Sequence, residues 1–390
     1  MNATVAPPDV DDIYRYCRTG FEFASDLDWR SLDPFDFLLA PFGERTRRLS
    51  PFAARLLIQL GRRSGRGLRR LAQIRPREEA KAIADFLWAS VVLAAAGQAS
   101  WVSSYHEALS SRLERLSIEL PNGRGWGYQF PYASRFVSVP AHTPNAYATV
   151  CCVTALTSAA SYLQDDYLLD IASSGARSVS VDLGIVRDGE QSWFRYYPGD
   201  DSWVVNVQAL IAGCFQELGQ LANNDKLCTY AELAATAAIV AQQNDGSFPY
   251  AMDKRGQFVD AFHTGFVLEG LNRFRRCGGK VDLVDVDASV EHGMDFMRQH
   301  LIGLAHLPRR FPDGPVALDG QNVAQLIQTL VLCGDAADRT VALRCWSEWI
   351  RQAGPPIDSQ YRRGRTSLRW DVSPMVLASS HLAANLEGAR

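Results

Sequence analysis

The stretch NAYATVCCVTAL at residues 145–156 has three counterparts further along the chain, each a polar residue followed by a mainly apolar run. The four copies align without gaps and start at Asn145, Asn206, His263 and Asn322. Their starts are 61, 57 and 59 residues apart, a period too long for one helix and suited to a pair of helices. The sequence is therefore predicted to consist of repeated helical hairpins.

The repeated segments combine small residues, such as Ala148, Gly213 and Gly270, with large apolar ones. A helix that is apolar on most sides is buried on most sides, and small residues let its neighbours approach closely. We therefore expect these segments to be inner helices. The same period extends backwards to the apolar run at 82–97 and forwards to the one at 372–386.

More ordinary amphipathic segments lie between the inner helices and are predicted to be outer helices. They cover about 100–118, 163–182, 225–243, 286–302 and 336–353, and a basic helix over 52–74 precedes the first inner helix. Six inner and six outer helices predict an all-α (α/α)6 toroid in a single domain over 51–390. Residues 1–50 are expected to be an irregular segment packed on this barrel.

A turn with an aromatic residue separates each outer helix from the next inner one. These aromatics are Trp126, Trp193, Phe248, Phe311 and Trp370, several of them beside an Asn-Gly or Asp-Gly turn. The long loops that follow, at 129–141, 195–203 and 249–260, fall on one end of the ring. Loops collected on one face of a repeat protein usually form its binding face, so a pocket rimmed by aromatics is expected there.

Composition excludes several classes of function. The formal charge of −3 gives no overall attraction to nucleic acid or to anionic membranes, and no 18-residue apolar run predicts a membrane span. An arginine-rich stretch around 62–70 is typical of the exposed face of an amphipathic helix. The eight cysteines show no metal-binding spacing, so we expect them to be buried thiols. The sequence does not start with an apolar leader, and a cytoplasmic protein is expected.

No HExxH, P-loop, GxSxG or dinucleotide-binding motif occurs in its structural context, so we expect no metal and no cofactor. The sequence does not indicate an oligomeric state.

The four starting positions, Asn145, Asn206, His263 and Asn322, should point towards a common axis. Three positions earlier in each repeat stand His142, Trp203, Asp260 and Asp319. One interpretation is that the Asp and Asn side chains only cap their helices. The other is that the amides and the imidazole hold the hydroxyls or the carboxylate of a polar ligand.

His263 is the first candidate for catalysis, and the alternative is a histidine satisfied within the core. If Asp260 bonds one ring nitrogen, the other can act as general acid or base in the cavity. His142 is the second candidate.

Tyrosines are abundant at the same end of the ring, at positions 128, 132, 147, 196, 197 and 250. They could stack on sugar rings, or one of them could transfer a proton if a cation such as Arg135, Arg195 or Arg369 lowers its pKa. Tyr197 and Asp201 complete the predicted catalytic set. Asp200, Asp201, Asp260, Asp319 and Asp371 could supply the pair of carboxylates that a glycoside hydrolase needs.

Two stretches resemble known families. QQNDGSFPY at 242–250 resembles the QW motif of terpene-cyclase and squalene-cyclase toroids, but DVDAS at 285–289 departs from the DxDD signature of class II terpene cyclases. DAFHTGFVLEGL at 260–271 resembles the HTGF signature of helical toroid proteins of bacterial polysaccharide biosynthesis. That group is similar to six-hairpin glycosidases and to uronate epimerases and lyases, so the resemblance implies a function on sugars.

Three functional hypotheses follow. The first is an enzyme of polysaccharide or glycan metabolism, with lyase or epimerase chemistry on uronic acids ranked above hydrolysis. The second is a terpene or prenyl cyclase, and the third is a glycan-binding protein without catalysis. The predicted substrate-binding residues are Trp126, Tyr128, Asn145, Trp193, Trp203, Asn206, Phe248, Tyr250, Asp319, Asn322, Arg369 and Trp370.

Overall fold

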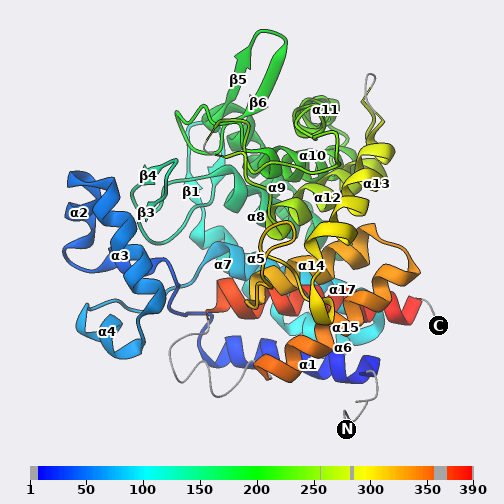
Figure 1. The fold of residues 1–390 in the computed structure, drawn as a ribbon, viewed down its shortest axis with the longest axis horizontal. Helices are drawn as coiled ribbons and strands as arrows, with labels where there is room; N and C mark the ends of the chain where they lie inside the picture. The colour runs from blue at the N-terminus through cyan, green and yellow to red at the C-terminus, as the bar shows by residue number, and fades with distance from the viewer. Residues whose placement is uncertain (1–7, 255, 282–284, 355–366, 389–390) are drawn as a thin grey trace.

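A computed structural model describes residues 8–254, 256–281, 285–354 and 367–388 (Figure 1). Within these residues, six inner helices form a closed ring, because each packs on the next along the chain and the last packs on the first. They are α5 (Ala80–Leu93), α8 (Ala146–Leu163), α10 (Val205–Leu221), α12 (Ala261–Arg276), α14 (Gly320–Cys333) and α17 (Ser373–Gly388).

An outer helix packs on each inner helix and completes an (α/α)6 toroid, which confirms the predicted fold class. Five of the outer helices lie where the repeat predicts them, and the sixth comes from the N-terminal segment. They are α7 (His106–Leu116), α9 (Asp166–Arg177), α11 (Asp225–Ile239), α13 (Val286–Phe296), α15 (Ala336–Ala353) and α1 (Val10–Asp26).

Helix α1 corrects the predicted domain boundary. Residues 10–26 are not irregular but form the outer partner of α17, beside which α1 lies in Figure 1. Asp9 caps the helix, and its apolar side, including Ile13, Cys17 and Phe21, is buried. The repeat did not reveal α1 because more than fifty residues separate it from α5. The first seven residues of the predicted segment lie outside the described residues.

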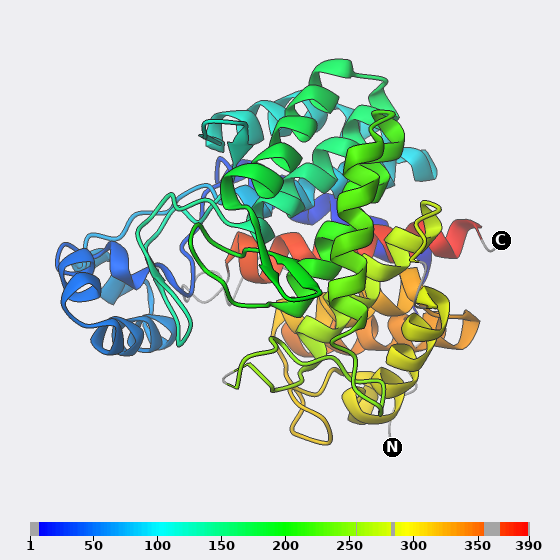
Figure 2. The same cartoon turned by 90° about the horizontal axis from the view of Figure 1, so that it is seen from above.

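The basic segment over 52–74 is not an outer helix, which is a second correction. It divides at Ser64 and Gly65 into α3 (Pro51–Arg63) and α4 (Arg66–Leu71). Together with the 3-10 turn η1 (Asp36–Leu39) and α2 (Gly43–Leu49), these helices form a lobe beside the toroid, which stands apart at the left of Figure 2. We call this group, residues 36–71, the arginine-rich lobe.

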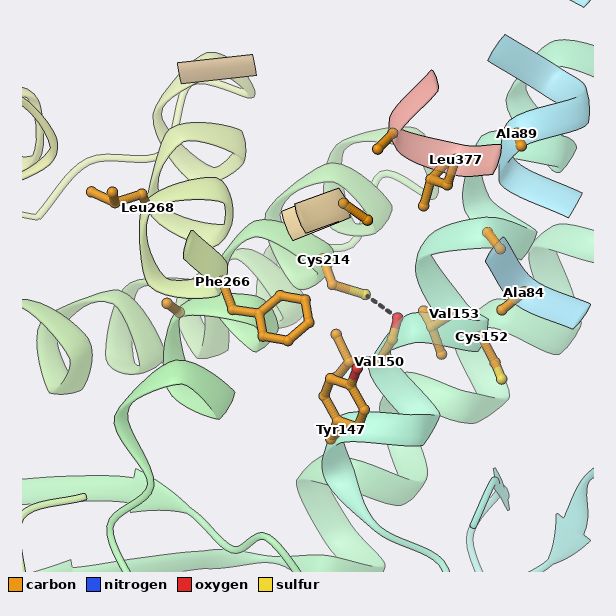
Figure 3. Packing of buried hydrophobic residues seen from close by; sticks show 14 of the residues in the cluster. Ala84, Ala89, Tyr147, Val150, Cys152, Val153, Cys214, Phe266, Leu268 and Leu377 are labelled. Atoms are coloured by element: carbon orange, nitrogen blue, oxygen red, sulfur yellow. Dashed lines mark hydrogen bonds between the residues drawn. The ribbon is translucent and has the colours of Figure 1, made fainter. Parts of the chain in front are cut away.

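Close backbone contact between α10 and α12 explains the small residues of the inner helices. A Cβ atom on Gly270 would lie 2.2 Å from the carbonyl oxygen of Ala209, and one on Gly213 would lie 2.5 Å from the carbonyl oxygen of Gly270. Figure 3 shows the tight packing nearer the axis, where Tyr147 of α8 and Phe266 of α12 approach at 5.5 Å between ring centroids. Cys214 points towards the carbonyl of Val150 in the same region.

The loops gather at the N-terminal ends of the inner helices, as the repeat predicts. The N–H of Ala146 donates to the carbonyl of Tyr196, and the N–H of Val205 donates to the carbonyl of Tyr250. Each loop thereby binds the start of the preceding inner helix. Three antiparallel pairs of short strands lie in these connections: β1 (Ile118–Glu119) with β2 (Arg124–Gly125), β3 (Tyr132–Ala133) with β4 (Ser138–Val139), and β5 (Ile185–Asp188) with β6 (Gln191–Phe194).

The remaining elements are single turns that extend or connect these helices. They are η2 (Ala94–Gln98), α6 (Ala99–Val102), η3 (Ser103–Tyr105), η4 (Ser178–Leu183), η5 (Met297–Leu301), η6 (Leu304–His306) and η7 (Leu368–Val372).

The turn that resembles the QW motif connects neighbouring hairpins. The side chain of Gln242 accepts a hydrogen bond from the Ser289 hydroxyl at 2.7 Å and donates to the Ser289 carbonyl at 3.0 Å. Gly246 has a φ of 89°, which is accessible to glycine at little cost, so the Asp-Gly step makes the predicted tight turn. Gln242 therefore fastens the end of α11 to the start of α13.

Two stretches, 80–116 and 146–163, are long and apolar enough to span a membrane by composition. Both contain inner helices, and most residues of their most apolar parts are buried in the ring. Their hydrophobicity is therefore explained by the core.

Candidate active site

A cavity of about 220 Å³ lies among the N-terminal ends of the inner helices. Four polar side chains reach it, namely Asn206, His263, Gln321 and Arg369. Most of its wall is aromatic, formed by Phe35, Tyr128, Phe130, Tyr132, Tyr147, Tyr196, Tyr250, Phe262, Phe266 and Trp370. The predicted aromatic pocket is therefore present, although its rim is made largely of other residues than those predicted.

His263 and Asp260 form a hydrogen-bonded pair at the start of α12. Asp260 is the N-cap, and its Oδ1 accepts the backbone N–H of His263 at 2.8 Å. The same carboxylate lies 2.8 and 2.9 Å from Nδ1 of the imidazole. A carboxylate accepts only, so this contact places a proton on Nδ1 and leaves Nε2 as the basic nitrogen of the neutral ring.

The capping and the catalytic interpretations of Asp260 are thus compatible, because one carboxylate serves both. Burial on its own raises the pKa of Asp260. The positive charge that the His263 ring carries when it is protonated, and the hydrogen bonds from its Nδ1 and its backbone N–H, outweigh burial, so the pKa lies below its ordinary value. Asp260 is therefore ionised at neutral pH. The ring of His263 lines the cavity and contacts Tyr250 edge to face, with centroids 4.6 Å apart.

The tyrosines of the cavity are neutral phenols, so the alternative in which a cation lowers one of their pKa values does not hold. Burial raises the pKa of Tyr128 to about 12 even though Arg369 opposes the shift. Burial likewise raises the pKa values of Tyr147, Tyr196 and Tyr250. These hydroxyls can donate hydrogen bonds or a proton to a ligand, but they are poor bases at neutral pH.

Arg369 lies at the base of the aromatic wall, in η7 just before α17. Its Nε and Nη2 donate to the two carboxylate oxygens of Asp33 at 2.6 and 2.9 Å, and both side chains are buried. The guanidinium also lies 5.2 Å from the ring centroid of Tyr128 and 5.4 Å from that of Trp370. The cation is therefore held by an N-terminal carboxylate and by aromatic faces.

Three buried polar atoms around the cavity have no hydrogen-bond partner in the described part of the chain. They are Oδ1 of Asn206, Oε1 of Gln321 and the hydroxyl of Tyr147. Their residues are at most 7% exposed. A buried polar group without a partner costs stability, so these atoms are suited to a ligand that supplies hydroxyl groups.

Six of the predicted binding or catalytic residues line the cavity, and a seventh, Asp260, holds one of them. The six are Tyr128, Asn206, Tyr250, His263, Arg369 and Trp370.

Four predicted aromatic contacts are structural instead. Trp126 is fully buried, and its Nε1 donates to the carbonyl of Leu113, while Phe248 packs in the core. Trp193 and Trp203 stack on each other with centroids 4.8 Å apart. An aromatic side chain after a turn packs equally well on the inner helices or on a ligand. The residue type therefore does not distinguish a structural role from a binding role.

Two predicted polar contacts cap helices, and a third bonds one of these caps. Asn145 caps α8 through the N–H of Ala148, and Asp319 caps α14 through the N–H of Asn322. The Asn322 amide donates back to Asp319 at 2.7 Å, and none of the three is part of the cavity wall.

Three predicted catalytic residues lie outside the cavity. His142 is exposed in a loop, and Asp201 is exposed and paired with Arg195 at 2.8 Å. Tyr197 is buried behind Tyr196, whose ring it meets edge to face. Adjacent residues point in different directions, so Tyr196 takes the position predicted for Tyr197.

Several cavity residues were missed by the sequence analysis. Gln321 lies next to the predicted Asn322, Phe266 belongs to the repeated segment that is predicted to be an inner helix, and Phe262 directly precedes that segment. Phe35 comes from the segment that was expected to be irregular, and no local pattern marks it. Phe130 lies within the loop 129–141, where only the tyrosines were noted.

No carboxylate is part of the cavity wall among the described residues, since Asp260 and Asp33 are turned to His263 and Arg369. Asp371, another predicted candidate, accepts the N–H of Ser367, and burial raises its pKa to about 7. The predicted pair of carboxylates for hydrolysis is therefore not assembled there. Within the described residues, no three His, Cys, Asp or Glu side chains are grouped to bind a metal ion.

A second cavity of about 470 Å³ lies further along the axis, beyond Phe262, Phe266 and Gln321, which line both cavities. Glu269 is buried in its wall and accepts hydrogen bonds from Gln325 at 2.6 Å, Gln328 at 3.0 Å and Thr329 at 2.9 Å. Burial outweighs these donors and raises the pKa of Glu269 to about 8.

Ionisation of Glu269 should weaken the fold at alkaline pH. Its pKa is raised in the folded state, so its contribution is full below the unfolded value of about 4.3 and is lost as the pH rises through about 8. Glu269→Gln, which cannot ionise, should reduce the fall in melting temperature between pH 5 and 9 by at least about 2 °C. Glu190→Gln, in the exposed turn of the β5–β6 hairpin, is the control and should leave the pH profile unchanged. Equal profiles for parent and Glu269→Gln would contradict the argument.

Comparison with solved structures finds the same toroid fold in other proteins. A cellobiose 2-epimerase from Bacillus thermoamylovorans aligns with a TM-score of 0.60 at 10% identity over 82% of this chain and 90% of the other. A GH76 α-mannanase from Bacteroides thetaiotaomicron gives 0.55 at 11% identity over 79% and 86%. A D-mannose isomerase gives 0.55 at 9% identity over 80% and 87%. No family model and no curated protein sequence matches the chain.

Proposed function

We propose that this protein is a sugar-processing enzyme that transfers a proton at a carbon atom of its substrate, as epimerases, isomerases and lyases do. One observation carries the proposal: the imidazole of His263, oriented by Asp260, lines a polar and aromatic cavity whose wall has no carboxylate in the described chain. A base with a free nitrogen among neutral phenols suits proton abstraction. A glycoside hydrolase needs two carboxylates at such a site.

The cavity suits a single sugar unit. Aromatic faces pack on the apolar faces of pyranose rings, and the amides of Asn206 and Gln321 can bind hydroxyl groups. Its volume of about 220 Å³ is below the range of about 300–1,000 Å³ that is typical of pockets for drug-sized ligands. One sugar, either free or at the end of a chain, is therefore the expected occupant.

The reaction begins when Nε2 of His263 takes the proton from the carbon beside a carbonyl or carboxyl group of the sugar. The electron pair of the broken C–H bond moves onto that group as an enediolate. Hydrogen bonds from neutral phenols and the positive charge of Arg369 stabilise the oxygen anion. Return of a proton to the opposite face gives an epimer. Return of a proton to the former carbonyl carbon, with transfer of a proton between the two oxygens of the enediolate, gives an isomer. Expulsion of a β-oxygen substituent, which leaves with the proton that His263 took, gives an unsaturated sugar.

Known toroids of this shape support the assignment of chemistry. Two of the aligned structures are a cellobiose 2-epimerase and a D-mannose isomerase, and both names describe a rearrangement of a sugar. A uronic-acid polymer remains within the proposal, because its carboxyl group acidifies the adjacent C–H bond.

A screen by proton NMR tests this function. The protein is incubated with reducing monosaccharides, cellobiose, free uronic acids and uronic-acid polymers, and the anomeric and vinylic signals are followed. We expect new signals from an epimer, an isomer or an unsaturated product with one class of sugar. Release of shorter sugars with no rearranged product would instead identify a hydrolase and overturn the proposal.

The aromatic wall also favours a second candidate, a prenyl cyclase on the same fold. Such an enzyme needs an acid that can protonate its substrate, and no described carboxyl group is part of the wall. Incubation with prenyl diphosphates and squalene, followed by gas chromatography of the extracts, tests it. A cyclised hydrocarbon or alcohol would replace the sugar proposal.

A further inference from the structure

Helix α3 of the arginine-rich lobe exposes an apolar stripe. Phe52, Leu56 and Leu60 follow one another at intervals of four residues, so they share one side of the helix, and they are 62%, 51% and 59% exposed. The opposite side is buried, since Ala54 and Ile58 pack in the core of the lobe. The helix thus has two apolar sides, and only one of them is covered by the protein.

The apolar exposure extends over the rest of the lobe. Leu49, at the end of α2, is 75% exposed and lies two residues before the start of α3. Leu68 and Leu71 of α4 are 49% and 82% exposed. Isolated exposed leucines are common, but six large apolar side chains on a lobe of this size indicate a binding surface.

The same lobe is strongly basic. Residues 42–71 contain nine arginines and one acidic residue, Glu44, although the whole chain has a formal charge of −3. Arg69 is paired with Asp36 at 3.0 Å and Arg47 with Glu44 at 2.7 Å, so these two belong to the structure. Six others are exposed, although Arg48 also pairs with Glu44 and Arg62 lies over the ring of Phe35: Arg45, Arg48, Arg62, Arg63, Arg66 and Arg70.

We propose that the arginine-rich lobe binds the surface of an anionic lipid bilayer. Amphipathic helices with Phe and Leu on one side and arginines around them insert their apolar side chains at the level of the headgroups. Arginines beside the apolar side chains attract anionic headgroups. Arg63 lies on the same side of α3 as Phe52 and Leu56, so charge and hydrophobicity meet on one surface.

An anionic bilayer fits both properties of the lobe, whereas other partners fit only one. Nucleic acid or an acidic polysaccharide would neutralise the arginines but leave the leucines exposed to water. A second copy of this chain would cover the leucines but bring two strongly basic lobes together. The combination of Leu, Phe and Arg therefore favours a lipid surface.

The position of the lobe relates this surface to the candidate active site. Phe35 and Tyr132 line the 220 Å³ cavity and also pack against the Leu38, Ala54 and Ile58 cluster of the lobe. Figures 1 and 2 show the lobe beside the β3–β4 loop, which carries Tyr132. The exposed stripe is on the opposite side of α3 from this cluster, so the lobe would lie between a bound bilayer and the wall of the cavity. If the proposed function holds, sugars carried on amphiphilic molecules are suitable substrates.

Co-sedimentation with lipid vesicles tests the binding. The full-length protein is mixed with vesicles of phosphatidylcholine alone or of equimolar phosphatidylcholine and phosphatidylglycerol. We expect binding only to the anionic vesicles, weakened by added salt because the ions screen the arginines. Leu56→Gln with Leu60→Gln and, separately, Arg63→Glu with Arg70→Glu should each weaken binding at least about tenfold.

Two control variants match these changes elsewhere on the surface. Leu304→Gln removes a leucine that is 84% exposed, and Arg187→Glu reverses an exposed arginine in the β5–β6 hairpin. Both should bind vesicles like the parent, and circular dichroism should show that all four variants are folded. No binding of the parent to anionic vesicles would overturn the proposal. So would loss of binding in the arginine variant alone, because it would show that the exposed apolar side chains take no part in binding the bilayer.

The vesicle assay does not depend on turnover. Failure of the membrane proposal and failure of the proposed sugar chemistry are therefore separate results.

Discussion

His263→Ala should lower kcat by about 10²–10⁴-fold on whichever sugar the protein rearranges, because it removes the base that abstracts the proton. Sugar binding should persist, since the aromatic wall, Asn206 and Gln321 remain. Steady-state kinetics together with calorimetric binding of the same sugar separate the two effects. A variant that binds as the parent does and turns over at the parental rate would show that His263 has no part in the chemistry.

His142→Asn is the matched control. His142 is exposed outside the cavity with a φ of 58°, a backbone conformation that asparagine tolerates, so this variant should keep full activity. Asp260→Asn tests the positioning of the imidazole. Asparagine can still cap α12, so the fold should persist while kcat falls at least about tenfold. A parental kcat and pH profile in Asp260→Asn would show that the carboxylate serves only as a helix cap.

Asp33→Ala should lower the free energy of unfolding by about 3–5 kcal/mol, because it leaves the buried guanidinium of Arg369 without its partner. The two residues are 336 positions apart, and their pair joins the N-terminal segment to the start of the last inner helix. Chemical denaturation followed by circular dichroism measures the loss. Phe35 and Trp370 flank this pair at the cavity, so sugar binding should weaken as well.

Asp28→Asn is the control for an exposed pair, because Asp28 has a φ of 49°, a backbone conformation that asparagine tolerates. Asp28 bonds Arg112 at 2.7 Å but its side chain is 57% exposed, so its loss should cost less than about 1 kcal/mol. Glu79 is a buried acid whose charge also acts on Arg369, and burial and the charge of Asp33 raise its pKa well above the ordinary value. Adding Glu79→Gln to Asp33→Ala removes this possible replacement for Asp33. If the double variant is still no less stable than Asp28→Asn, the ion pair does not hold the segment.

The sequence predicted the ring of helices because its repeat is a property of the whole chain. Inner and outer helices alternate at nearly constant spacing, and an error of a few residues does not change which segments are buried. The position of each helix start within its repeat was predicted less accurately. Asn145 is an N-cap whereas His263 is the third residue of its helix, so the gapless alignment equated positions almost one turn apart.

That difference in phase explains much of the error in the candidate site. His142 was equated with Asp260, yet it lies in the loop before the cap of α8. Gln321 rather than Asn322 reaches the cavity because neighbouring residues on a helix point about 100° apart. The positions of Asp33 and Phe35 at the site depend on contacts between opposite ends of the chain. No local sequence pattern indicates such contacts. The pair of His263 and Asp260 was predicted because the two residues are only three positions apart in the sequence.

Incorporation of solvent deuterium tests the central claim most directly. The protein is incubated in D₂O with the sugar that it converts, and the carbon-bound deuterium in substrate and product is measured by NMR and mass spectrometry. Where the product is an epimer or an isomer, we expect deuterium at the carbon next to the carbonyl or carboxyl group with the parent and with His142→Asn, and none with His263→Ala. Where the product is unsaturated, the same carbon should lose its hydrogen with the parent and keep it with His263→Ala. Formation of an epimer or isomer without deuterium at any carbon, or the same conversion in His263→Ala, would contradict proton transfer by His263.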